Sequence, residues 1–214
     1  MLFLDRDKAG QKLAVALRDV KSANMLVLGI PRGGVIVARP IAEELAVPLD
    51  IIVPRKIGMP GNPEFAVGAV APDGTTVYNA GVLRAARLNQ GDLEPIVQQE
   101  VDEIRRREKF YRGDLSPLKV SGKRVVLVDD GAATGYTLFA ALDYLQKMDA
   151  GEIIAAVPVA PPDTAMELAK RADILVCLHS PEGFMSVGQF YWKFDQVSDQ
   201  EVINILQSGN NNTD

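Results

Sequence analysis

The stretch VVLVDDGAATGYT, residues 125–137, decides the fold that the sequence predicts. It begins with four apolar and mostly β-branched residues, which predict a strand buried on both faces. Two adjacent carboxylates, Asp129 and Asp130, follow, and then a loop of small residues with two threonines. A helix is expected from this loop to about Met148. A strand, a polar loop and a helix in this order indicate one unit of a parallel α/β sheet.

The same alternation continues on both sides of this stretch. Further buried strands are predicted at residues 25–30, 50–54, 152–159 and 174–178, and helices at residues 35–47, 91–113 and 163–171. Residues 65–70 and 75–78 predict a hairpin, because Pro72, Asp73 and Gly74 supply turn dihedrals between them. We therefore predict one α/β domain over residues 1–209, with a mostly parallel central sheet flanked by helices. The polar residues 210–214 predict a disordered tail.

The composition of the chain disfavours several classes of function. The chain has 214 residues, 47% hydrophobic and 24% charged, as in an ordinary globular protein. Its net charge of −5 gives no electrostatic footprint for nucleic acid, which disfavours that partner. The lone Cys177 excludes an intrachain disulfide, and the lone His179 leaves too few ligands for a histidine-rich metal site. With no signal-like start and no apolar run of the ~18–20 residues that span a bilayer, we expect a cytoplasmic protein without a membrane partner.

The loop at residues 131–137 has the composition of a phosphate site. It opens a helix, where exposed N–H groups attract anions, and its threonines add two hydroxyl donors. In an extended segment Asp129 and Asp130 point to opposite faces, which disfavours a pair sharing one proton. A carboxylate that accepts from vicinal sugar hydroxyls is the favoured reading, and a helix N-cap with a solvated neighbour is the structural alternative.

A second glycine-rich loop, GIPRGG at residues 29–34, follows the first predicted strand. It keeps the glycine spacing of a Walker A loop, but Val35 stands where that motif needs lysine, and it does not match G-x-G-x-x-G. Arg32 beside Gly33 and Gly34 fits an anion site, although two glycines after a strand also form simple tight turns.

Residues 125–137 resemble the phosphoribosyl pyrophosphate (PRPP) signature of the type I phosphoribosyltransferases: a hydrophobic strand, two acidic residues and a small-residue loop with Thr-Gly-x-Thr. The order of elements is similar from about Met25 to Leu178. The stretches from Gly29 and from Val128, with residues 188–194, resemble more narrowly a group of uncharacterised members. The resemblance implies the type I fold, with a flexible lid between Ile57 and Phe65 and a small C-terminal hood at about residues 179–198.

The resemblance also implies the roles of individual residues. The catalytic carboxylates Asp129 and Asp130 would meet the ribose 2- and 3-hydroxyls. The loop around the 5-phosphate would comprise Gly131, Ala132, Ala133, Thr134, Gly135, Tyr136 and Thr137. The pyrophosphate would be held by Arg32, Gly33, Gly34, Arg55 and Lys56. Mg²⁺ would bind together with PRPP, with no direct protein ligands. The structural alternative is that Arg32 and Lys56 pair with carboxylates such as Glu43 and Glu64.

The acceptor side has weaker signals. Phe190, Tyr191 and Trp192 belong to an aromatic concentration in a chain that is only 6% aromatic, and such rings can sandwich a planar base. They fit a small satellite core equally well. Ala133 stands where 6-oxopurine transferases carry an acid, which disfavours a hypoxanthine- or guanine-type enzyme. The arginines at 105–107 alternate with Glu103 and Glu108, which predicts a solvated helix face rather than a phosphate patch.

We therefore predict a PRPP-dependent glycosyltransferase that moves ribose 5-phosphate to a nitrogenous base or related acceptor and releases pyrophosphate. Its partners would be small-molecule substrates, and a homodimer is compatible with the sequence. A regulator that binds PRPP or a nucleotide without turnover is the first alternative, because a fold and a ligand loop do not prove catalysis. A hydrolase or phosphatase acting on ribose phosphates is the second.

Overall fold

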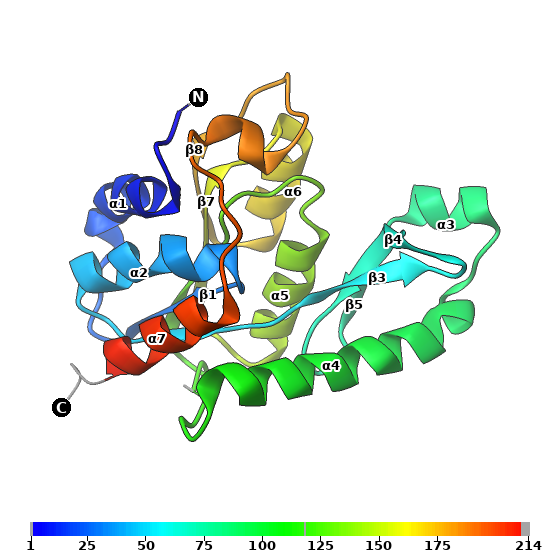
Figure 1. Cartoon of the computed structure of the whole chain (residues 1–214), viewed down its shortest axis with the longest axis horizontal. Coiled ribbons are helices and arrows are strands. Elements are labelled where there is room, and N and C mark those ends of the chain that lie inside the picture. Colours follow the sequence, from blue (N-terminus) through cyan, green and yellow to red (C-terminus); the bar gives the residue numbers. More distant parts are fainter. Residues whose placement is uncertain (1, 118, 211–214) are drawn as a thin grey trace.

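A five-stranded parallel sheet forms the centre of the molecule (Figure 1). The computed structural model describes residues 2–117 and 119–210. The strands of this sheet run in the order β2-β1-β6-β7-β8, and every neighbouring pair is parallel. Their bounds are β1 Met25–Gly29, β2 Leu49–Ile51, β6 Arg124–Val128, β7 Glu152–Val159 and β8 Ile174–His179. This architecture confirms the predicted α/β class.

Helices cover both faces of the sheet. On one face lie α1 (Arg6–Ala16), α2 (Gly33–Leu45) and α7 (Asp199–Asn210); on the other lie α5 (Tyr136–Lys147) and α6 (Pro162–Arg171). The side chains of β6 divide between the two layers. Val126 and Val128 pack with the α1–α2 layer, whereas Val125 and Leu127 pack with the α5–α6 layer. Because both faces are covered, β6 is apolar at each of these positions.

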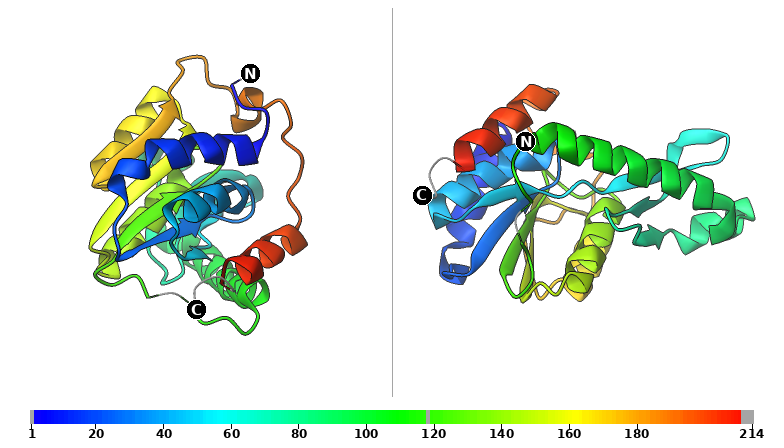
Figure 2. Two further views of the ribbon diagram at one scale, coloured as in Figure 1. Left: turned by 90° about the vertical axis from the view of Figure 1, so that its left-hand side faces the viewer. Right: turned by 90° about the horizontal axis from the view of Figure 1, so that it is seen from below.

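Between β2 and β6 the chain leaves the sheet and builds an arm, which projects to the right in Figure 1. The arm contains an antiparallel sheet of β3 (Arg55–Met59), β4 (Asn62–Val70) and β5 (Thr76–Tyr78), followed by α3 (Ala80–Ala86) and η2 (Gln90–Leu93). The long helix α4 (Glu94–Arg112) then returns along the arm to the core, as the right-hand view of Figure 2 shows.

The predicted hairpin at residues 65–78 is present as β4 and β5. Residues 57–65, expected to be a loop, instead form most of a second hairpin, in which β3 pairs with β4. Gly61 has a φ of +78° at its turn, a conformation that glycine adopts without steric penalty. The β3 strand is hard to recognise in the sequence because the glycine and proline content of this segment is typical of a loop. Arg55 and Lys56 therefore begin β3 rather than end β2, which closes at Ile51.

Helices α1 and α7 were not predicted, nor were the short turns η1 (Arg18–Val20) and η3 (Val187–Phe190). The sequence does hold a signal for α1. Asp5 caps it by accepting from the Lys8 N–H at 2.8 Å, and Ala9, Leu13 and Leu17 recur at the four-residue spacing of a buried helix face. Asn210 is the last residue of α7, and residues 211–214 of the predicted tail lie outside the described residues.

The strand order locates the site. From β1 the chain moves outward to β2 on one side, and β6, β7 and β8 follow on the other side, so the order reverses between β1 and β6. In open α/β sheets, ligands bind outside the carboxyl ends of the strands at such a reversal. Both loops singled out in the sequence, residues 29–34 and 129–137, begin there, and the Ile30 N–H donates to the Val128 carbonyl across the gap at 2.9 Å.

Candidate active site

The two carboxylates sit at the end of β6 in a tight local arrangement. Asp129 Oδ1 accepts from the backbone N–H of Asp130 at 2.8 Å, and Asp130 Oδ2 accepts from Arg6 Nε at 2.7 Å. The side chains of Arg6 and Asp130 are only 12% and 16% exposed. Neither aspartate caps α5, whose N-cap is Gly135. The N-cap alternative is therefore wrong.

Burial dominates the electrostatics of this pair. It raises the pKa of Asp129 well above its ordinary value, and the neighbouring charge of Asp130 raises it further. The Asp130 N–H and the charges of Arg6 and Lys56 act in the opposite direction on the pKa of Asp129. Burial also raises the pKa of Asp130, which the hydrogen bond from Arg6 opposes. Poorly solvated carboxylates of this kind gain most from a ligand that supplies hydroxyl donors or positive charge.

The loop after β1 packs directly against the carboxylates. A Cβ atom added to Gly33 would lie 2.0 Å from Asp130 Oδ2, and one added to Gly34 would lie 2.7 Å from the carbonyl oxygen of Val128. The peptide bond between Pro31 and Arg32 is cis. Glycine at 33 and 34 is thus required for the loop and the acidic pair to approach each other this closely.

The loop at residues 131–137 is anchored on one side and open on the other. The Ala132 N–H donates to the Val159 carbonyl at 2.9 Å, and the Thr164 hydroxyl donates to the Ala133 carbonyl at 2.8 Å. Within the described part of the chain, the N–H groups of residues 133–137 donate to no protein acceptor. Because Tyr136 begins α5, these unpaired donors gather at a helix N-terminus, which favours an anion.

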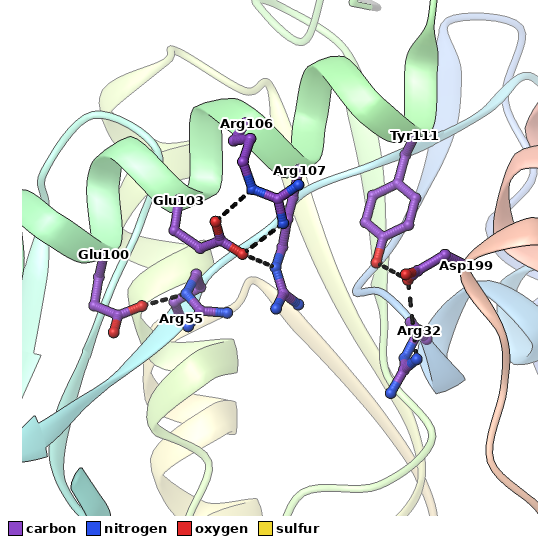
Figure 3. Close-up of polar contacts among 8 residues, drawn as sticks. All are labelled: Arg32, Arg55, Glu100, Glu103, Arg106, Arg107, Tyr111 and Asp199. Carbon is purple, nitrogen blue, oxygen red and sulfur yellow. Dashed lines mark hydrogen bonds and ion pairs between the residues drawn. The ribbon is translucent and has the colours of Figure 1, made fainter.

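Of the predicted pyrophosphate residues, Arg32 and Arg55 make ion pairs, shown in Figure 3. Arg32 Nη1 lies 3.9 Å from Asp199 Oδ1, a carboxylate that also accepts from the Tyr111 hydroxyl at 2.6 Å. Arg55 Nε is paired with Glu100 of α4. Lys56 is exposed, and in the described residues it makes no ion pair, although its positive charge acts to lower the pKa of Asp129.

The alternative that these basic residues pair with carboxylates holds for Arg32, whose partner is Asp199, but Glu43 and Glu64 are not the partners. Glu43 faces Arg39 of its own helix at 3.9 Å, and no ion pair joins Glu64 to Lys56 among the described residues.

One cleft of about 560 Å³ connects the predicted binding elements. Pro31 of the first loop, Lys56 of β3 and Thr137 of the loop at residues 131–137 all line it. The β3–β4 hairpin and α4 form its outer walls, through Arg55, Gly58, Met59, Pro60, Gly61, Pro63, Glu64, Ile96, Gln99, Glu100 and Arg107. The sequence prediction of a solvated face holds for Arg105 and Arg106, which are exposed, but Arg107 turns into this cleft.

The comparisons with known proteins agree with this geometry. Residues 6–195 match the family model described as the phosphoribosyl transferase domain. The chain belongs to the phosphoribosyl transferase domain family. Two Mycobacterium tuberculosis proteins, from strains CDC 1551 and H37Rv, are named provisionally as phosphoribosyl transferases and are 40% identical to it over 205 residues, 96% of this chain. The chain spans 46% of the length of these relatives.

A solved structure shares the fold of this chain along its whole length. The crystal structure of TT1426 from Thermus thermophilus is 41% identical, with a TM-score of 0.82, and the match covers 98% of this chain and 99% of that one.

No helix in residues 2–117 and 119–210 is long and apolar enough to cross a membrane.

The C-terminal aromatics of this phosphoribosyl transferase domain do not form the expected open sandwich. Phe190 and Tyr191 are buried with Phe3 in a small cluster, and only Trp192 is largely exposed, at 71%. The acceptor-binding prediction is therefore not supported for Phe190 and Tyr191, and the satellite-core alternative is correct for them. The Tyr191 hydroxyl instead donates to the backbone carbonyl of Asp130 at 2.6 Å.

Arg6 is the site residue that sequence reasoning missed. Its guanidinium stacks on the Phe194 ring, 3.8 Å from the centroid, and Nη1 donates to the Asp195 carbonyl at 2.8 Å. Arg6 thus joins the start of α1, residues 194–195 and Asp130. No local pattern marks a residue that lies 124 positions from its partner, so this contact had no signal in the sequence.

Proposed function

We propose that the protein is a PRPP-dependent phosphoribosyltransferase, which transfers ribose 5-phosphate from PRPP to a nitrogenous base or related acceptor and releases pyrophosphate. The observation that carries the proposal is the crevice between β1 and β6. There an open helix N-terminus, two poorly solvated carboxylates and a cleft lined by basic residues adjoin one another. Such a site suits a sugar with an anionic group at each end.

The two ends of PRPP would be held by different elements. The free N–H groups of residues 133–137 would take the 5-phosphate at the start of α5. Asp129 and Asp130 would accept from the ribose hydroxyls. Arg32, Lys56 and the backbone at Gly33 and Gly34 would hold the pyrophosphate. Fixing the ribose at both ends leaves its C1 atom positioned for an incoming acceptor.

Electrostatics would supply much of the catalysis. Departure of pyrophosphate leaves positive charge on the ribose ring, in an oxocarbenium-like transition state. The carboxylates of Asp129 and Asp130 are poorly solvated, so their attraction for that charge is stronger than it would be in water. Lys56 and Arg32 would stabilise the charge that develops on the leaving group.

Magnesium is proposed to accompany PRPP rather than to occupy a protein cage. In the described residues, no cluster of three or more His, Cys, Asp or Glu side chains is able to hold a metal ion. Mg²⁺ commonly enters phosphate sites on the oxygens of its substrate, with few protein ligands. Bound in that way, it would neutralise the charge of the leaving pyrophosphate.

The test combines turnover with binding. The protein is mixed with labelled PRPP, Mg²⁺ and a panel of bases, and pyrophosphate release is followed. We expect release that depends on one acceptor. PRPP binding without release for any acceptor would support a regulator, and loss of the ribosyl group to water would support a hydrolase; either result contradicts a transferase.

Binding measurements on variants test the pyrophosphate site itself. Lys56→Ala is expected to weaken PRPP by roughly 10- to 150-fold, because a hydrogen bond to a charged group is worth about 1.5–3 kcal/mol. The affinity for ribose 5-phosphate, which lacks the pyrophosphate, should change much less. The exposed Arg105, paired with Asp102 outside the cleft, provides the matched Arg105→Ala control. Equal losses for both ligands would mean that Lys56 contacts no pyrophosphate.

A further inference from the structure

Helix α4 places Arg107 in the cleft, and in the described structure only part of its guanidinium makes hydrogen bonds. Arg107 lines the same cleft as Pro31, Lys56 and Thr137. Its Nε donates to Glu103 at 2.7 Å, and in the described part of the chain its two Nη groups make no hydrogen bond. Figure 3 shows its guanidinium hanging away from α4, with the Nη groups at the free end of the side chain.

The spacing along α4 explains why this arginine faces inward. Ile96, Glu100 and Arg107 all line the cleft, and they are separated by four and then seven residues, which places them on one helix face. Arg106 is one residue earlier and lies about 100° around the helix, so it points to solvent with a side chain that is 64% exposed. A run of three arginines therefore contains one that differs in position from its neighbours.

The ion pairs around Arg107 leave positive charge uncompensated. Arg55 is matched by Glu100. Glu103 has to serve both Arg106 and Arg107, and their hydrogen bonds lower the pKa of Glu103 to about 2, so it stays ionised. Glu103, Arg106 and Arg107 together carry one net positive charge. Lys56 adds another.

Glu64 is the remaining carboxylate on the cleft wall, and it lies on the exposed part of β4. Counting it, the side chains named here still have a positive balance. Arg107 and Lys56 line this cleft together with Pro31 of the loop after β1.

We infer that Arg107 is a pyrophosphate-binding residue, which completes from α4 the site formed by Lys56 and the loop at residues 31–34; this inference rests on the proposed function. The planar guanidinium has two Nη groups for two phosphate oxygens, and the bond from Nε to Glu103 fixes its plane beforehand. The arm is then more than a wall of the cleft. Arg55 and Lys56 of the arm and Arg107 of α4 would then supply most of the basic groups near the leaving group.

The test compares Arg107→Ala with Arg105→Ala. Arg105 is exposed and pairs with Asp102 of its own helix, whereas Arg107 shares Glu103 and lines the cleft that contains Lys56. Calorimetric titrations use magnesium pyrophosphate, PRPP and ribose 5-phosphate in turn. Arg107→Ala should lower the affinity for pyrophosphate and for PRPP by roughly 10- to 150-fold, because charge-assisted hydrogen bonds are lost. The affinity for ribose 5-phosphate should stay within about twofold of that of the unmodified protein, and so should the affinity for every ligand with Arg105→Ala.

Each other outcome has a defined meaning. Unchanged pyrophosphate binding by a folded Arg107→Ala protein overturns the inference, as does an equal loss for ribose 5-phosphate. Should that variant not fold, Arg107→Lys keeps the charge without the fork and is expected to bind pyrophosphate more weakly than the unmodified protein but more tightly than Arg107→Gln. If the unmodified protein binds PRPP while Arg107 proves irrelevant, only this inference fails. If the unmodified protein binds neither PRPP nor pyrophosphate, the proposed function fails with it.

Discussion

Replacing Gly33 with alanine tests whether the loop after β1 and the acidic pair act as one unit. The added Cβ would lie 2.0 Å from Asp130 Oδ2, 2.6 Å from Asp130 Cγ and 2.8 Å from Arg6 Nε. Ordinary contacts begin at about 3.5 Å, so the Asp130 carboxylate must move by more than about 1 Å. That displacement breaks or stretches the 2.7 Å bond from Arg6. The substitution therefore misplaces the carboxylate without removing any charge.

Two magnitudes follow from this clash. Overpacking of this kind costs about 1–3 kcal/mol of stability. Since 1 kcal/mol shifts the Tm of a domain of 150–250 residues by about 2–4 °C, the expected loss is roughly 2–12 °C. If Asp130 accepts from a ribose hydroxyl, losing that charge-assisted bond weakens PRPP by a further 10- to 150-fold, from about 1.5–3 kcal/mol.

Thermal melts and PRPP titrations measure the two effects separately. Gly183 is the control, because a Cβ there meets no atom within 4 Å and its φ lies outside the left-handed region. Gly183→Ala should change stability by less than about 0.5 kcal/mol and leave PRPP affinity unaltered. A Gly33→Ala protein with the Tm and the PRPP affinity of the unmodified chain would refute the reasoning, and so would equal effects at the two glycines.

Two further predictions concern the surroundings of the acidic pair. Burial holds the pKa of Asp129 above its unfolded value, so this group stabilises the fold most below the unfolded pKa of about 4, and the contribution falls as pH rises. Asp129→Asn, which keeps an oxygen for the Asp130 N–H, should raise the Tm at pH 7 and weaken PRPP; a lower Tm at pH 7 would contradict this. Tyr191→Phe removes the donor to the Asp130 carbonyl and should cost about 1–3 kcal/mol in urea unfolding, against little change for Trp192→Phe at an exposed position. Equal stability of the Tyr191→Phe and Trp192→Phe proteins would show that this hydrogen bond is immaterial.

The features that the sequence predicted well are those determined by neighbours along the chain. The apolar run at residues 125–128 requires a strand covered on both faces, and the turn chemistry at residues 71–74 requires the β4–β5 hairpin. The loops after β1 and β6 were recognisable because glycine, threonine and aspartate have strong local roles. Parallel strands with helical connections then bring both loops to one edge of the sheet.

The partners of these loops were decided by tertiary structure alone. Asp130 is hydrogen-bonded to Arg6, which lies 124 positions away in the sequence, and to Tyr191, which lies 61 positions away. Contacts at such separations produce no periodic or compositional pattern in the sequence. The inward direction of Arg107 depends on how α4 packs against the arm, since in the sequence it is one of three equivalent arginines. Phe190 and Tyr191 are buried because residues 2 and 3 pair with them, which no local propensity encodes. Local sequence preferences thus determined the strands of the central sheet, the β4–β5 turn and the loop at residues 131–137, whereas long-range packing determined which charged side chains surround that loop.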